Sequence, residues 1–376
     1  MPDPIAKVDT VLLKVASRCN IDCKYCYVYH SSDQQWRNQP KRMSGEIIDA
    51  AIGRLKALKE SQGQDLAVVL HGGEPLLLGL APLRQLLVGL RRALGPASTI
   101  ALQTNGTLVT DEVLDLMAET RTRLSISIDG PQGVNDRFRI DHKGSSTFAA
   151  VMEGIQRARF HPDSHHFFYG VLAVIDPESD PADVYSFFRS IDVGSVDFLF
   201  KDGNHDRLPL GKSALDTIEY GDWLARLWDI YVTDPEPIAV ECLDNFVRSI
   251  YGKSATKEGS GVSNYGILIV DTDGSITKND TLKNSYDGAD RFVEHWNILD
   301  HSFETILTSA ECKEYISGQL PVCNECGDCP FLTVCGGGMM LHRWSSDNGY
   351  DNPSVYCADQ KYLISHIVES LRSLVA

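Results

Sequence analysis

Residues 9–26, DTVLLKVASRCNIDCKYC, join an apolar run to three closely spaced cysteines. The run at 9–16 is rich in Val and Leu, which is typical of a buried strand. Cys19, Cys23 and Cys26 follow it with the spacing C-x3-C-x2-C. Three thiolates on one loop can hold three irons of a [4Fe–4S] cluster, and the fourth iron then stays open for another ligand. The alternative is a structural zinc loop, which usually needs four protein ligands, and only His30 is an obvious further candidate nearby.

The rest of the first half alternates apolar runs with amphipathic stretches. Strands are predicted at 66–71, 99–104, 123–128, 167–175 and 195–200, and helices at 44–61, 81–94, 110–119, 146–159, 181–190 and 213–231. Alternating strands and helices indicate βαβ units and a parallel sheet, and six such units fit an open or closed α/β barrel. Polar residues cluster after several of these strands, at the sheet edge where such folds place their chemistry.

Composition and charge exclude several classes of function. The 376 residues carry 35 Lys and Arg against 51 Asp and Glu, a net charge of −16. A chain this acidic is a poor candidate for binding nucleic acid or an anionic membrane. The start lacks the long apolar run of a signal peptide, and no stretch is long and apolar enough to span a membrane. We therefore expect a cytoplasmic protein, in which clustered cysteines are metal ligands or catalytic groups.

The pattern changes after residue 232. A hairpin is predicted around Asp273-Gly274, followed by clustered cysteines, a glycine triplet at 336–338 and a helix near 357–374. We expect two domains, 1–232 and 233–376, with the second built around the later cysteines.

The order of motifs resembles the radical S-adenosylmethionine (SAM) superfamily. An aromatic residue, Tyr25, precedes the last cysteine of the loop, and His71-Gly-Gly-Glu-Pro-Leu76 follows the second strand. Gln103-Thr-Asn-Gly106 and Ser127-Ile-Asp-Gly-Pro131 follow the third and fourth strands. The resemblance covers nearly the whole chain. It implies a partial (β/α)6 TIM-like barrel in which Cys19, Cys23 and Cys26 ligate the cluster and SAM chelates the open iron.

The same resemblance implies a set of SAM-binding residues. Backbone and carboxylate groups near the second strand would meet the SAM ammonium, and later residues would meet its ribose, carboxylate and adenine. The predicted set is Tyr25, Gly72, Gly73, Glu74, Asn105, Ser127 and Arg139. The alternative for the polar members is an ordinary role at a strand end, and for Tyr25 a place in the core.

The last third resembles the SPASM extension, which houses auxiliary iron–sulfur clusters in peptide-modifying radical SAM enzymes. The resemblance implies four ligands for one auxiliary [4Fe–4S] cluster, Cys326, Cys329, Cys335 and Cys357; a structural zinc on the same residues is the alternative.

Two departures from the SPASM pattern bear on the number of clusters. Met339 and Asn279 stand where the extension usually has cysteines, so we expect only one auxiliary cluster. Cys323 could substitute as a ligand. Cys242 and Cys312 are interpreted as buried thiols. The alternative is a degenerate cluster that uses both of them together with Cys323.

Local features resemble the FxsB-like branch, whose members include enzymes that form cyclophanes in ribosomally made peptides. These features are Tyr27-Val-Tyr29, Asp33 to Arg37 with Trp36, the segment around His342 and Trp344, and Asn352 to Cys357. Packing is the alternative role for Trp36, His342 and Trp344.

The branch implies a radical SAM oxidoreductase that joins an aromatic ring carbon to a side-chain Cβ in a precursor peptide, with leader and core, after hydrogen abstraction by a 5′-deoxyadenosyl radical. Asp280 would accept the proton and the auxiliary cluster the electron, with flavodoxin or ferredoxin as the external electron donor. The alternatives are sulfatase-maturase-like formation of formylglycine, thioether crosslinking, and a non-enzymatic electron carrier or scaffold.

Overall fold

The computed structural model describes residues 7–31, 33–254, 259–262 and 266–375. The chain forms two compact units, each assembled from separate segments. The described residues of the first unit are 7–31, 33–127, 139–170 and 266–316, and those of the second are 128–138, 171–254, 259–262 and 317–375. The division expected between residues 232 and 233 stays a prediction.

The first unit is built on parallel strands around β1 (Thr10–Ala16). On one side of β1 lie β2 (Ala67–Gly72), β3 (Thr99–Thr104) and β4 (Arg123–Ser127), all parallel. On its other side lie β8 (Ile267–Val270), which is parallel to β1, and the antiparallel strands β9 (Ser275–Thr277) and β10 (Trp296–Asn297). The predicted strands and the hairpin around Asp273-Gly274 are thereby confirmed.

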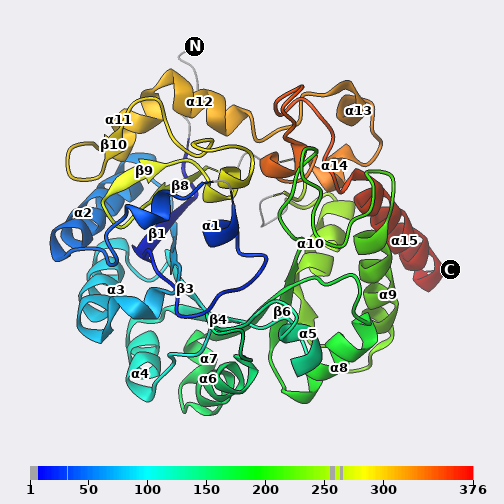
Figure 1. Ribbon diagram of the computed structural model, residues 1–376, viewed down its shortest axis with the longest axis horizontal. Helices are drawn as coiled ribbons and strands as arrows, with labels where there is room; N and C mark the ends of the chain where they lie inside the picture. Colours follow the sequence, from blue (N-terminus) through cyan, green and yellow to red (C-terminus); the bar gives the residue numbers. More distant parts are fainter. Residues whose placement is uncertain (1–6, 32, 255–258, 263–265, 376) are drawn as a thin grey trace. The chain divides into compact units, whose positions relative to one another are not determined.

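Helices cover the outer side of strands β1–β4 (Figure 1). They are α2 (Gly45–Gln62), α3 (Leu80–Leu94), α4 (Asp111–Thr120) and α6 (Phe148–Phe160). Ser44 and Thr110 cap α2 and α4, because their hydroxyls accept the free backbone amides of the first turn. The shorter elements are α1 (Tyr27–His30), η1 (Gln35–Arg37), η2 (Pro75–Leu78), α7 (Ser164–Phe167), η3 (Asp280–Asn284), α11 (Phe303–Thr308) and α12 (Ala310–Ser317).

The second unit combines strands β6 (Ser195–Leu199) and β7 (Ala239–Val240) with long helices; β5 (Phe168–Val174) is parallel to β6. The helices are α8 (Pro181–Ser190), α9 (Glu219–Thr233), α10 (Glu241–Ile250) and α15 (Cys357–Val375), with shorter α5 (Gln132–Asn135), α13 (Asn324–Gly327), α14 (Leu332–Cys335) and η4 (Met340–Arg343). Helix α9 begins later than predicted, since the preceding residues form turns in which Thr217 bonds to Ala214. The buried Asp359 accepts amides at the start of α9 and pairs with Lys212 at 2.6 Å.

The described strands do not close into a barrel, so the open form of the predicted α/β architecture is the correct one. Where the chain is described, no helix combines the length and apolarity needed to cross a bilayer.

Candidate functional site

The three cysteines of the first loop lie where β1 ends. Backbone amides point at two of the sulfurs: Ile21 donates to Cys19, and Val28 and Tyr29 donate to Cys26. Burial, together with the neighbouring thiols, raises the pKa of Cys19 to about 12 and that of Cys26 to about 11. Such thiols stay protonated alone, but a bound iron would ionise them and the amides would stabilise the thiolates. The donor set therefore fits an iron–sulfur cluster.

The glycines that follow β2 pack directly against this loop. Gly73 donates its amide to Ala16 O at 2.8 Å, and Glu74 donates to Arg18 O at 2.9 Å. A Cβ on Gly73 would lie 2.4 Å from Arg18 O and would also collide with the Tyr29 hydroxyl. A Cβ on Gly72, whose φ is +145°, would collide with Ala16 O. Only glycine permits this approach, which keeps backbone groups of the strand end beside the cysteine loop.

Glu74 is fully buried and its carboxylate is largely occupied by internal donors. Oε1 accepts from Leu76 N and Thr104 Oγ1 at 3.0 and 2.7 Å, and Oε2 accepts from Asn105 N at 2.8 Å. Burial raises the pKa of Glu74, although these donors oppose the shift. A carboxylate has about four acceptor positions, so little capacity remains for another donor. Contact between this carboxylate and the SAM ammonium stays a prediction, whereas its role in joining the ends of β2 and β3 is visible.

The remaining predicted SAM-binding residues lie at neighbouring strand ends or in the following loop. Asn105 Nδ2 lies 3.6 Å from Cys19 Sγ, which makes it a hydrogen-bond donor to a proposed cluster ligand. Arg139 is buried and donates to the Tyr25 hydroxyl at 3.0 Å. Ser127 accepts from Gln103 Nε2 at 2.8 Å at the end of β4. Their direct contacts with SAM stay predictions.

Asp280 lies in a buried group of charges in the first unit. Its carboxylate is 2.8 Å from Lys14 Nζ and accepts from the Tyr27 hydroxyl at 3.2 Å. Burial alone would raise the pKa of Asp280, but Lys14, His71 and Lys283 outweigh it and the pKa is lowered. Asp280 is therefore ionised, as a proton acceptor must be.

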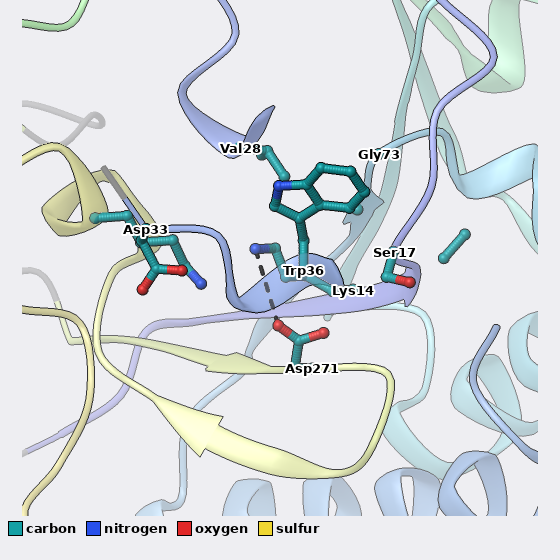
Figure 2. Close-up of a pocket in the computed structure, with 10 residues that line it drawn as sticks. Lys14, Ser17, Val28, Asp33, Trp36, Gly73 and Asp271 are labelled. Atoms are coloured by element: carbon teal, nitrogen blue, oxygen red, sulfur yellow. Dashed lines mark ion pairs between the residues drawn. The ribbon is translucent and has the colours of Figure 1, made fainter. Parts of the chain in front are cut away.

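A small pocket lies beside these charges. Figure 2 shows the Lys14 ammonium reaching toward Asp271, with the Trp36 indole across the pocket and Asp33 at its side. Trp36 packs edge-on against Tyr29 at 4.9 Å, and Arg18 lies over its ring. These contacts give Trp36 a packing role, which was the alternative to its interpretation as a feature of the FxsB-like branch.

Lys14 is the residue of this site that sequence reasoning missed. It is 4% exposed on the central strand and also lines the pocket. Burial would lower its pKa, but Asp280 and Asp271 raise it, so Lys14 is charged. The available signal was a single lysine inside the apolar run TVLLKVA, since lysine is almost never buried unless paired.

The later cysteines gather in the second unit. Burial raises the pKa of Cys326 to about 12, and neighbouring Cys323, Cys335 and Cys357 contribute to the shift. Cys329 in turn acts on the pKa of Cys357. The five thiols thus interact electrostatically within the second unit, and four of them are the predicted ligands of the auxiliary cluster.

The glycine triplet shapes the backbone around Cys335. Gly336, Gly337 and Gly338 all have positive φ, between +68° and +81°, a conformation that glycine adopts without strain. This path directs the amides of Gly337 and Gly338 at the Cys335 sulfur. A loop that offers two amides to one sulfur suits a thiolate ligand.

The two departures from the SPASM pattern have structural roles. Asn279 caps η3, since its side-chain oxygen accepts from Thr281 N at 3.1 Å. Met339 packs against the backbone position of Gly259. Cys312 is fully buried on α12, with Glu311 and Lys278 as the charges that act on it. The interpretation of Cys242 and Cys312 as non-ligands stays a prediction.

Comparison with known proteins shows which proteins the chain resembles. Residues 13–176 match the model of the radical SAM superfamily. The chain is 26% identical over 370 residues to a serine-type anaerobic sulfatase-maturating enzyme of Bacteroides thetaiotaomicron, covering 91% of this chain and 85% of the relative. A cysteine-type anaerobic sulfatase-maturating enzyme of Clostridium perfringens is 24% identical over 365 residues, covering 94% of each chain. The solved structure of native anSMEcpe with bound AdoMet shares the fold, with a TM-score of 0.80 at 22% identity over 97% of this chain and 98% of that chain.

These relatives correct the functional prediction. The expectation of a cyclophane-forming enzyme is wrong, because the similarity across nearly the whole chain is to sulfatase-maturating enzymes. The FxsB-like assignment depended on short segments whose aromatic residues have packing partners here. His342 lies edge-on to Tyr356 at 4.9 Å, and Trp344 contacts Tyr350 at the same ring distance. Packing residues of this kind do not distinguish one branch from another.

The cofactors follow from the match to the radical SAM model, the similarity to sulfatase-maturating enzymes and the cysteines of the two units. They are SAM, the [4Fe–4S] cluster that binds it, and auxiliary iron–sulfur ligation; the individual ligands stay predictions that the donor sets support. The cysteine loop, the glycine-lined strand end beside it and the match of residues 13–176 to the radical SAM model agree, and the chain is a SAM-dependent enzyme.

Proposed function

We propose that this enzyme oxidises the Cβ of a serine or cysteine side chain in a polypeptide to the aldehyde of formylglycine. The observation that carries the proposal is the extent of the similarity. Sulfatase-maturating relatives of both the serine and the cysteine type align over more than nine-tenths of the chain, far beyond the radical SAM region at 13–176.

When bound, SAM and its cluster supply a radical that removes one hydrogen atom from the substrate Cβ. Conversion of a serine CH2OH group to CHO then requires the loss of one proton and one electron. Asp280 is the proposed proton acceptor, because Lys14 keeps its carboxylate ionised although it is buried. The auxiliary cluster is the proposed electron acceptor. With a cysteine substrate the same losses give a thioaldehyde, which water converts to the aldehyde with release of hydrogen sulfide.

Asn279 and Met339 stand where the usual SPASM extension, with two auxiliary clusters, has cysteines. We propose a single auxiliary cluster, held by Cys326, Cys329, Cys335 and Cys357. One cluster is sufficient for the stoichiometry, since each turnover releases one electron in addition to the abstracted hydrogen atom. An external reductant, for which flavodoxin and ferredoxin are the candidates, would supply the electron for SAM cleavage.

The test is a direct assay of the anaerobically reconstituted enzyme. Sulfatase-derived peptides, each in a serine and a cysteine form, are incubated with SAM and dithionite and then examined by fragmentation mass spectrometry. The expected product lacks two hydrogens at the serine, or has oxygen in place of sulfur with two hydrogens fewer at the cysteine. Formation of 5′-deoxyadenosine with every peptide left unmodified, or a carbon–sulfur bond joining two residues of a peptide, would contradict the proposal.

A further inference from the structure

Arg343 is one of the largest fully buried side chains of the protein, 1% exposed at the end of η4. Its Nη2 donates to Gly318 O and Gln319 O at 3.0 and 2.8 Å. The Nε–H group has no acceptor among the described residues, and no described carboxylate lies within ion-pair distance of the guanidinium. A buried charge is expensive unless a charge of opposite sign accompanies it.

Three of the later cysteines interact electrostatically with this guanidinium. Burial lowers the pKa of Arg343, and Cys326, Cys323 and Cys335 oppose that shift together with Tyr350. A protonated thiol carries no charge, so these neighbours compensate Arg343 only when they are thiolates. Iron binding makes them thiolates, and a [4Fe–4S] cluster with four thiolate ligands is negatively charged in its usual oxidation states.

Backbone contacts hold the guanidinium in this position. Asn352 Nδ2 donates to Arg343 O at 2.9 Å, and Val355 N donates to His342 O at 2.8 Å, which fastens η4 to the segment before Cys357. The carbonyls that accept from Nη2 lie just before Cys323 in the chain. Arg343 therefore links the segments that lead into the first and last of the gathered cysteines.

We propose that Arg343 is a positioning residue for the auxiliary cluster, whose negative charge it balances and whose reduction potential it raises. A fixed cation favours the more negative, reduced state of a nearby cluster, and charge is one of the main determinants of cluster potential. A higher potential makes the cluster a better acceptor of the electron released by the substrate. That consequence rests on the proposed function, whereas the shift in potential does not.

The experiment isolates the auxiliary cluster in a variant that carries Cys19→Ala, Cys23→Ala and Cys26→Ala. Its midpoint potential is measured by redox titration followed by electron paramagnetic resonance, without substrate or SAM. Three changes at Arg343 separate charge from structure: Arg343→Lys keeps the charge, Arg343→Gln keeps a hydrogen-bond donor without charge, and Arg343→Met keeps neither. Arg248→Gln, an exposed arginine on α10, is the matched control.

If the proposal is correct, the potential follows the charge. Arg343→Gln and Arg343→Met shift it to more negative values, while Arg343→Lys and Arg248→Gln stay close to the parent. If Arg343→Met fails to assemble a cluster, the Lys and Gln variants still provide the comparison. Equal potentials in the Lys and Gln variants would overturn the proposal. If the variant that lacks Cys19, Cys23 and Cys26 binds no iron, Arg343 has no cluster charge to balance and the proposal is overturned. If the potential shifts as expected but the enzyme does not oxidise peptides, only the proposed function is contradicted.

Discussion

Replacement of Lys14 by methionine tests the buried charge group around Asp280. Methionine nearly preserves the length of the side chain but removes the ammonium that lies 2.8 Å from the Asp280 carboxylate. Both residues are almost completely buried, at 4% and 1% exposure. Breaking a buried pair by removing one partner typically costs about 3–5 kcal/mol, because the other charge stays buried without compensation. We expect the free energy of unfolding of Lys14→Met to fall by about this amount, measured by urea unfolding of the apoprotein at neutral pH.

The pH dependence of that variant should reverse in sign. In the parent, the pKa of Asp280 is lowered from 3.8, so its contribution to stability is present above 3.8 and is lost as pH falls through the lower folded value. Without Lys14 the largest opposing influence is removed, and we expect burial to raise the pKa of Asp280 above its ordinary value. The folded variant then binds the proton more tightly than the unfolded chain, and the contribution of Asp280 decreases as pH rises.

Catalysis supplies a second readout for Lys14→Met. If Asp280 accepts the substrate proton, the variant should still form 5′-deoxyadenosine but oxidise less peptide, and the oxidised fraction should recover at higher pH as Asp280 ionises. The control is Lys56→Met, which removes the exposed partner of Glu60 and should change neither stability nor product measurably. The reasoning would be refuted by a Lys14→Met enzyme with parental stability and a parental pH profile for peptide oxidation.

Three further changes test the two proposed cluster sites. Gly73→Ala places a Cβ 2.4 Å from a backbone carbonyl and should abolish SAM binding measured by calorimetry, whereas Gly53→Ala, with open space around its Cβ, should bind SAM as the parent does. Asn105→Ala removes an amide donor to a cluster thiolate; a redox titration should therefore show the SAM-binding cluster at a more negative potential, and an unchanged value would refute this role. Cys329→Ser should lower the iron and sulfide content by about half while Cys242→Ser leaves it unchanged, and equal iron in both variants would exclude Cys329 as a ligand.

Asp280 shows how much of the candidate site could be predicted from sequence motifs. The family resemblance implied its role as a proton acceptor, in the turn that follows the predicted hairpin. In the structure Asn279 caps that turn, and Asp280 pairs with Lys14. Their positions in the chain are more than 260 residues apart. No periodicity or local motif reports a contact at that separation, because it results from the pairing of β1 with β8 and the hairpin that follows β8.

The sequence by itself determined the features that arise from near neighbours in the chain. The strand β1, the three cysteines after it and the glycines after β2 are encoded by short patterns whose physical requirements are local: burial of alternating apolar runs, ligand spacing and the lack of a Cβ. Only the tertiary structure showed that Glu74 is occupied by internal donors, that Lys14 keeps Asp280 ionised, and that Arg343 is buried beside thiols without an acidic partner. These features depend on which distant groups are buried together in a low-dielectric interior. Whether a buried charge is stabilised depends on the groups around it, and those groups come together only when the whole chain has folded.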